Sequence, residues 1–240
     1  MTRMIWLAIV AIAVTIPCAF ITLVLATVSP ASPWIEPVIR FWARRIVGAA
    51  GIELRAENLE TIERGQRYIL VANHHSYLDI PCLFAVVPQT IRFMAKVSLF
   101  KIPLFGWALT RNGFIPIDRK NRRTAVKSFD LAAERIRRGN TIVIFPEEGR
   151  SRERAMRPFQ RGAFLLALKS EQPIVPIAID GTYDVLPATR WRVTPGPVTI
   201  RVGTPLATAG ATLRDKERLA NEARAQIEMM LEKRALNDER

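Results

Sequence analysis

The chain has 240 residues, and its 35 Lys and Arg against 22 Asp and Glu give a formal net charge of +13. Its 49% hydrophobic residues exclude a disordered polyelectrolyte, its 12 Gly exclude a collagen-like chain, and its two Cys exclude a disulfide scaffold. We therefore expect one folded domain with an additional segment. Apart from Arg3, every charge lies at Glu36 or beyond, so this later part carries a net +12. Such a charge implies an anionic partner, either nucleic acid or anionic lipid.

An uncharged, mostly apolar segment of 24 residues covers 5–28. As a helix it would be about 36 Å long, enough to cross a hydrocarbon core of about 30 Å. Pro17 would kink this helix or divide it into two pieces that suit a re-entrant or interfacial hairpin. A cleavable signal peptide is disfavoured because the run is long and the cleavage pattern at 27–29 is weak. We expect a membrane-associated segment, either spanning or monotopic.

A second, amphipathic helix is expected from Trp34 to a C-cap near Gly51, with Arg40, Arg44 and Arg45 between its apolar positions. It suits a lipid headgroup interface, or it packs on the domain with its Arg side chains solvated. Basic residues directly after an apolar segment place this side of the membrane in the cytoplasm. We assign 1–50 to a membrane anchor with its amphipathic helix and 51–240 to the folded domain.

The folded domain alternates short β-branched runs with helical stretches, which is typical of an α/β protein. The predicted helices cover 121–138, 162–169 and the last thirty residues from 211. The six predicted strands cover 68–72, 91–95, 113–117, 141–145, 174–179 and 198–202. We expect a single domain with a central, mostly parallel sheet flanked by helices.

The two His of the chain are adjacent and follow directly after the first predicted strand. Active sites of α/β domains are usually built at strand ends. On a regular helix His74 and Asp79 would lie about 140° apart, so we expect His74 in the turn before the helix, where its ring could reach Asp79. The carboxylate would then hold the tautomer of a general base. The alternative is a loop histidine next to a carboxylate that stabilises the helix N-terminus.

Two further strand ends carry charged side chains. Residues 113–119 end in Arg119, which could form two hydrogen bonds to a phosphate or a carboxylate. Residues 145–151 present Glu147 and Arg150 on a turn that Pro and Gly enforce. In both segments a surface ion pair without a ligand is the alternative. We expect no metal site, because adjacent His side chains point in different directions and neither Cys has a partner at ligand spacing.

Four sequence blocks, taken in order, resemble the glycerolipid acyltransferase family, which includes the 1-acylglycerol-3-phosphate acyltransferases. The blocks are Asn73-His74 with Asp79, Gly113 to Arg119, Phe145 to Ser151, and Val175-Pro176-Ile177. Each block alone is a weak signal, whereas four in this order at fitting spacing are specific. The third block departs from the family's pattern, because Glu148 stands where the family has Gly and Gly149 where it has Thr.

The resemblance implies an O-acyltransferase of phospholipid biosynthesis that converts lysophosphatidic acid to phosphatidic acid. His74, oriented by Asp79, would be the general base for the acceptor hydroxyl, which attacks the thioester of acyl-CoA or of an acyl carrier protein. No cofactor is implied beyond this co-substrate. The location implied is the cytoplasmic side of a membrane, the inner membrane if the source is bacterial. The implied substrate-binding residues are Lys96, Gly113, Arg119, Glu147, Arg150 and Ser151.

Other functions use the same residues. The acceptor could be another lysophospholipid or an acylated amino acid lipid, and a thioester hydrolase would use the same base to activate water. A membrane-tethered nucleic-acid-binding protein would explain the positive charge but not the His and acids at strand ends. The apolar run at 99–105 fits core packing, a segment that dips into the membrane, or the wall of an acyl groove. We therefore expect a lyso-lipid, an acyl thioester and a membrane as partners, and no nucleic acid.

Overall fold

The computed structural model describes residues 2–118, 122–137, 139–161 and 164–238. Its centre is one seven-stranded sheet in the order β1-β7-β6-β2-β5-β3-β4. Neighbouring strands run parallel except for β6 and β7, which are antiparallel. The strands are β1 (Ile52–Glu57), β2 (Ile69–Ala72), β3 (Ile91–Lys96), β4 (Ile115–Ile117), β5 (Thr141–Ile144), β6 (Ile174–Asp180) and β7 (Gly196–Val202). The predicted α/β class with a mostly parallel sheet is confirmed.

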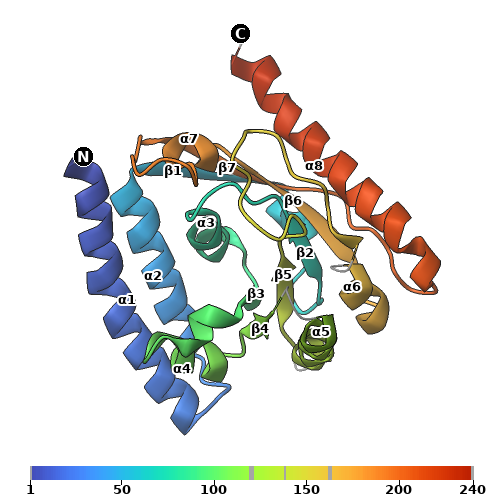
Figure 1. Ribbon diagram of the computed structural model, residues 1–240, viewed down its shortest axis with the longest axis horizontal. Coiled ribbons are helices and arrows are strands. Elements are labelled where there is room, and N and C mark those ends of the chain that lie inside the picture. Colours follow the sequence, from blue (N-terminus) through green and yellow to red (C-terminus); the bar gives the residue numbers. More distant parts are fainter. Residues whose placement is uncertain (1, 119–121, 138, 162–163, 239–240) are drawn as a thin grey trace.

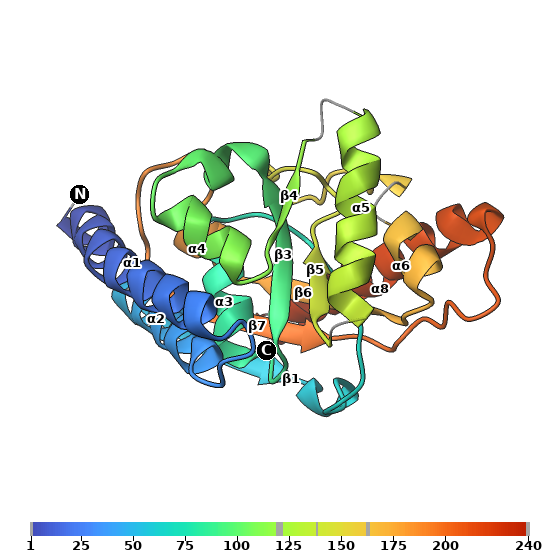
Figure 2. The ribbon, with the colours of Figure 1, turned by 90° about the horizontal axis from the view of Figure 1, so that it is seen from below.

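Helices cover both faces of the sheet (Figures 1 and 2). One face carries α1 (Thr2–Val28), α2 (Ile35–Ala50), α3 (Asp79–Val86) and α4 (Phe105–Arg111). The other face carries α5 (Arg122–Arg137), α6 (Phe164–Ser170) and α8 (Lys216–Asp238). Short elements connect them: η1 (Leu59–Thr61), η2 (Val97–Lys101), α7 (Thr182–Val185) and η4 (Leu213–Asp215). Because the central strands are covered on both sides, their sequences are mostly apolar, as in β2, where all four residues are apolar and buried.

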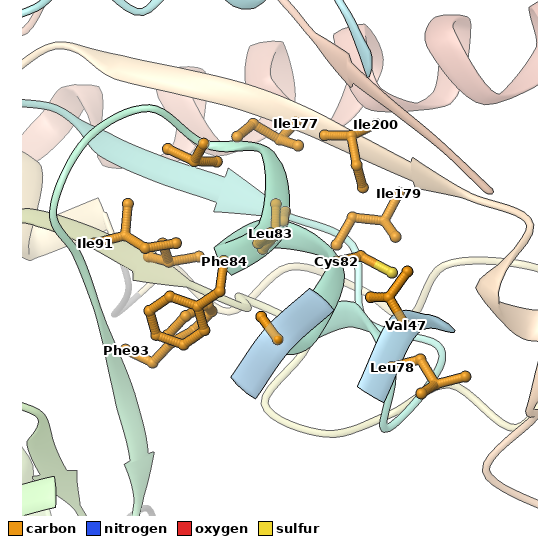
Figure 3. Packing of buried hydrophobic residues seen from close by; sticks show 14 of the residues in the cluster. Val47, Leu78, Cys82, Leu83, Phe84, Ile91, Phe93, Ile177, Ile179 and Ile200 are labelled. Carbon is orange, nitrogen blue, oxygen red and sulfur yellow. The ribbon is translucent and has the colours of Figure 1, made fainter. Parts of the chain in front are cut away.

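The side chains of β6 show how one strand serves both layers. Ile177 and Ile179 pack with the cluster around α3, whereas Ile174 and Ala178 pack with the cluster around α5 and α8. This division follows from the alternation of side chains along a strand. On the α3 side, the ring of Phe84 lies 5.1 Å from the ring of Phe93 on β3 (Figure 3). Two separate apolar layers therefore hold the sheet in place.

The sequence prediction missed β1, which pairs with β7 at one edge of the sheet. Its residues beyond Leu54 are exposed, and its charged side chains obscure the apolar alternation of a strand. The strand predicted from 113 begins only at Ile115, because Gly113 has a φ of +84° and forms a turn. These differences leave the order of the central strands unaffected.

The helix α1 is continuous through Pro17, so of the two expected effects of this proline, a kink or a division, the division into two pieces is wrong. It is the one helix of the described chain that is long and apolar enough to cross a membrane. One face of α1 packs against α2 and α4, while large apolar side chains are exposed along the rest of the helix. These exposed side chains are Ile5, Trp6, Ile9, Ile12, Ile16, Phe20, Ile21, Val24 and Val28.

The amphipathic helix α2 packs on the domain, which was one of its two predicted placements. Arg40 donates hydrogen bonds to the backbone carbonyls of Phe84 and Gln89, at 3.4 and 3.1 Å. Glu36 forms an ion pair with the buried Arg92 of β3 at 2.6 Å. The division into an anchor at 1–50 and a domain from 51 stays a prediction, although α2 ends at Ala50 and β1 begins at Ile52.

Candidate active site

The candidate site lies where β2, β5 and β6 end, three neighbours in the centre of the sheet. His74 follows β2, Glu147 follows β5 and Thr182 follows β6. Because these strands are parallel, their carboxyl ends meet at one edge, where α/β folds place their ligands. Segments that are more than seventy residues apart in sequence therefore come together there.

His74 contacts Asp79 as the spacing predicts, from the turn just before α3. Its Nδ1 lies 2.7 Å from the Oδ2 of Asp79, which is the first residue of the helix. The same oxygen accepts hydrogen bonds from the backbone N–H groups of His75 and Ser76, at 2.8 and 2.9 Å. A carboxylate at Nδ1 assigns the ring proton to that nitrogen and leaves Nε2 as the acceptor. The imidazole also stacks on Phe145 at 4.0 Å, which fixes its plane.

Asp79 is completely buried, and burial alone would raise its pKa. Hydrogen bonding and charge from His74, together with the backbone N–H of Ser76, outweigh burial and hold the pKa of Asp79 below its usual value. The carboxylate is therefore ionised at neutral pH. An ionised Asp79 stabilises an imidazolium on His74, as proton abstraction by this ring requires.

Glu147 supports the backbone of His74 and is 1% exposed. One carboxylate oxygen accepts from the backbone N–H of His74 at 2.6 Å, and the other accepts from the N–H of Arg157 at 2.7 Å. Burial raises the pKa of Glu147 to about 7, although both hydrogen bonds favour the charged form. The backbone N–H of Ser151 completes the arrangement by donating to the carbonyl of His74 at 2.8 Å.

Arg150 is the cation that the structure places beside the His-Asp pair. Its guanidinium carbon lies 3.7 Å from the centre of the Tyr77 ring. Burial lowers the pKa of Arg150, but a guanidinium stays charged in proteins. Its Nε is buried without a hydrogen-bond partner among the residues that the structure describes. Arg150 as a whole is half-buried, which makes its guanidinium a candidate for binding an anionic ligand.

The structure places the other predicted site residues on several different elements. Lys96 ends β3 and is exposed, and the hydroxyl of the buried Ser151 donates to the carbonyl of Ala155 at 2.7 Å. Gly113 lies at the amino end of β4, where its positive φ allows the turn. Arg119 lies outside the described residues. The roles of these four residues in substrate binding stay predictions.

The structure adds two residues to the site that were not predicted. The side-chain amide of Asn73 bonds both backbone groups of Ile179, at 2.9 and 2.7 Å, and so joins the ends of β2 and β6. Thr182 lies against Asp79 although it is about a hundred residues later in the chain. Asn73 belongs to the first sequence block and could have been chosen from it, whereas no local pattern marks Thr182.

An apolar cavity of about 410 Å³ begins next to the site. Tyr77 and Leu78, which follow His74 closely in the chain, line one part of it. The other walls include residues of α1, α2, α3, β3, η2 and α4, among them Leu99 and Phe105. The run at 99–105 therefore forms part of a groove wall, one of its three predicted roles. Within the described chain no group of three His, Cys, Asp or Glu side chains could hold a metal ion.

Comparison with known sequences and structures gives consistent results. The family model described as Acyltransferase matches residues 53–180. The chain is similar to the 1-acyl-sn-glycerol-3-phosphate acyltransferase BAT2, chloroplastic, of Brassica napus, with 33% identity over 160 residues, 66% of this chain and 45% of the relative. It is also similar to the human 1-acyl-sn-glycerol-3-phosphate acyltransferase alpha, with 32% identity over 188 residues, 78% of this chain and 66% of the relative.

The chain spans 45, 48 and 40% of three plant and algal relatives, about half of their length. Among solved structures, the 1-acyl-sn-glycerophosphate acyltransferase PlsC from Thermotoga maritima superposes with a TM-score of 0.80. The superposition covers 95% of each chain at 24% sequence identity. It includes the N-terminal helices as well as the sheet, so the whole architecture is shared.

Proposed function

Because this chain belongs to the acyltransferase family, we propose that it transfers an acyl group from a thioester to the free hydroxyl of lysophosphatidic acid, giving phosphatidic acid. The observation that carries this proposal is the His74–Asp79 pair, which adjoins both a cation and an apolar cavity, because nearby Tyr77 contacts Arg150 and lines the cavity. A phosphate and a fatty acyl chain are the two chemical features that such a site would bind. The names of the relatives support the same acceptor.

The reaction proceeds by general base catalysis. Nε2 of His74 accepts the proton of the acceptor hydroxyl while the oxygen attacks the thioester carbonyl. The tetrahedral intermediate then expels the thiolate. The imidazolium of His74 donates to this thiolate the proton that it took from the hydroxyl. Asp79 holds the proton on Nδ1 and stabilises the imidazolium through the 2.7 Å contact. No covalent acyl-enzyme forms, and the acyl thioester, from CoA or a carrier protein, is a co-substrate.

The acceptor phosphate binds at Arg150, with Arg119 and Lys96 adding positive charge. Arg150 has the geometry for two parallel hydrogen bonds to phosphate, and its buried Nε lacks a partner within the described part of the chain. Glu147 fixes the backbone of this turn through its two hydrogen bonds. Part of the excess of basic residues thereby serves the substrate, and the rest attracts anionic lipid.

The acyl chain occupies the apolar cavity. Tyr77 and Leu78 lie at the end of the cavity that adjoins His74, so a chain bound there would present its thioester to the acceptor hydroxyl. The cavity walls include α1, which connects the binding site to the segment that meets the membrane. A lipid substrate can then reach the site without leaving an apolar environment.

The helix α1 attaches the enzyme to one leaflet on the cytoplasmic side of a membrane, the inner membrane if the source is bacterial. One side of the helix packs on α2 and α4, which leaves the exposed apolar side chains to enter the lipid. Trp42 of α2 donates a hydrogen bond to the hydroxyl of Thr15 at 2.9 Å, which satisfies a polar group inside this layer. These contacts support the monotopic alternative over a spanning helix.

The test of this function is a product analysis with the purified full-length protein in detergent. The protein is given acyl-CoA with lysophosphatidic acid, with lysophosphatidylcholine, with an acylated amino acid lipid, or with no acceptor. We expect phosphatidic acid in equimolar ratio to released thiol, and little thiol release without acceptor. Acylation of a different lipid would revise the acceptor. Free fatty acid as the sole product would identify a thioester hydrolase instead.

A further inference from the structure

Three side chains from distant segments form a stack beside the candidate site: Arg150, Tyr77 and Trp191. The guanidinium of Arg150 covers one face of the Tyr77 ring at 3.7 Å. The indole of Trp191 lies 6.1 Å from the same ring, with the two planes inclined by 28°. Arg150 follows β5, Tyr77 precedes α3, and Trp191 lies in the loop between α7 and β7. Tyr77 thus contacts both a cation and a second aromatic ring.

The loop that carries Trp191 is fixed to the segment that carries Tyr77. The hydroxyl of Ser76 donates to the carbonyl of Leu186 at 2.6 Å, and Ser76 and Pro187 form an isolated β-bridge. At the other end of the loop the N–H of Thr194 donates to the carbonyl of Val185 at 2.9 Å. Trp191 itself is 75% exposed, so it contributes little to the core. Its main contact with the site is therefore the ring of Tyr77.

The stack contacts both the apolar cavity and the surroundings of the His74–Asp79 pair. Tyr77 and Trp191 both line the apolar cavity, whereas Arg150 lies near enough to Asp79 to interact with its charge. The buried Nε of Arg150 has no hydrogen-bond partner in the described ranges, so the face of Tyr77 is the contact that sets the plane of the guanidinium. A guanidinium must lie in a defined plane to bind phosphate through two hydrogen bonds.

We propose that Trp191 is a positioning residue for the acceptor, acting through Tyr77 on Arg150. Trp191 stacks on Tyr77 and fixes its ring, and Tyr77 then presents Arg150 in the orientation that receives a phosphate. The identity of the phosphate-bearing ligand rests on the proposed function. The stack itself is independent of the reaction and can be tested by anion binding alone.

The kinetic test compares Trp191→Ala with Trp191→Phe in detergent, where binding to a bilayer plays no part. We expect Trp191→Ala to raise the KM for lysophosphatidic acid about fivefold, the equivalent of one aromatic or cation–π contact, with kcat and the KM for acyl-CoA within about twofold. Trp191→Phe keeps a ring and should restore the KM. Trp34→Ala is the matched control, because Trp34 is 68% exposed on the distant start of α2.

A double mutant tests whether the effect passes through Arg150. In the Arg150→Gln background, Trp191→Ala should raise the acceptor KM no further, because coupled residues are not additive. An equal rise in both backgrounds would overturn the proposal. If the KM for acyl-CoA rises and the KM for lysophosphatidic acid does not, Trp191 acts only as a wall of the acyl cavity, and the proposal is overturned as well.

Anion binding separates this proposal from the proposed function. Calorimetry with inorganic phosphate needs no turnover, and we expect about fivefold weaker binding to Trp191→Ala than to the wild type or Trp191→Phe. Equal phosphate affinity in all three proteins would overturn the proposal that Trp191 positions Arg150. If the affinities follow this order but the wild type acylates no phosphate-bearing lipid, the proposed function fails and the stack stands.

Discussion

The backbone N–H of His74 donates a 2.6 Å hydrogen bond to the side chain of Glu147, a residue 73 positions later in the chain. The carbonyl of His74 is held from the same turn, by the N–H of Ser151 at 2.8 Å. Both backbone groups of His74 are thus fixed by the segment after β5, while Asp79 fixes its side chain. The imidazole and the turn that we propose to bind phosphate form one unit, so a change in one should alter the other.

Glu147→Gln tests this unit through the pH dependence of stability. The pKa of Glu147 rises from 4.5 to about 7 on folding, so the folded state favours the protonated form. The protonated side chain of Glu147 therefore adds about 3 kcal/mol to the free energy of unfolding below about pH 4.5. This contribution is lost as the pH rises through about 7. Gln is neutral at every pH. Urea unfolding from pH 5 to 8 should show the wild type losing stability relative to Glu147→Gln, and parallel curves would contradict this assignment.

Asp79→Asn should lower kcat about 10³- to 10⁴-fold with a smaller effect on KM, because an amide no longer assigns the proton to Nδ1 or stabilises the imidazolium. The same change weakens the hydrogen bonds from the N–H groups of His75 and Ser76, so the variant should also unfold at a lower temperature. Steady-state kinetics with acyl-CoA and lysophosphatidic acid measure the first effect. A variant with near wild-type kcat would remove Asp79 from the mechanism.

Glu148 adopts a φ of +56° in the turn beside Arg150, at the position where the family has Gly. Glu148→Gly should stabilise the fold by about 1 kcal/mol, since this conformation is unfavourable for residues with a Cβ. Removing a carboxylate near the phosphate site should also raise activity with lysophosphatidic acid relative to lysophosphatidylcholine. Glu171→Gly is the matched control, because Glu171 is exposed with a φ of +53° after α6. It should gain stability without any change in acceptor preference.

Ala108→Phe places a ring in the apolar cavity, since Ala108 of α4 lines it and is 5% exposed. If the cavity holds the acyl chain, kcat/KM should fall more for long-chain than for short-chain acyl-CoA, because the volume for methylene groups is reduced. Ala207→Phe, at an exposed position outside the cavity walls, serves as the control. Equal loss with every chain length would place the acyl chain elsewhere.

Local features of this molecule could be predicted from the sequence, and features built from distant segments could not. The contact between His74 and Asp79 lies within one turn, so strand position and spacing were sufficient. The strand β1 was not predicted, because the charged residues Glu53, Arg55 and Glu57 obscure its apolar alternation. Thr182 and the cavity depend on which segments the fold brings together, and α1 meets α4 across about eighty residues of sequence.

The most direct test of the central claim is the rate of phosphatidic acid formation by His74→Ala under saturating acyl-CoA and lysophosphatidic acid. His74 is the general base of the proposed reaction, so we expect the rate to fall to background. Circular dichroism and the unfolding temperature should show that the variant remains folded, because the ring is not needed for the hydrogen bonds of the His74 backbone. Formation of phosphatidic acid by the folded variant at a rate near that of the wild type would contradict the account.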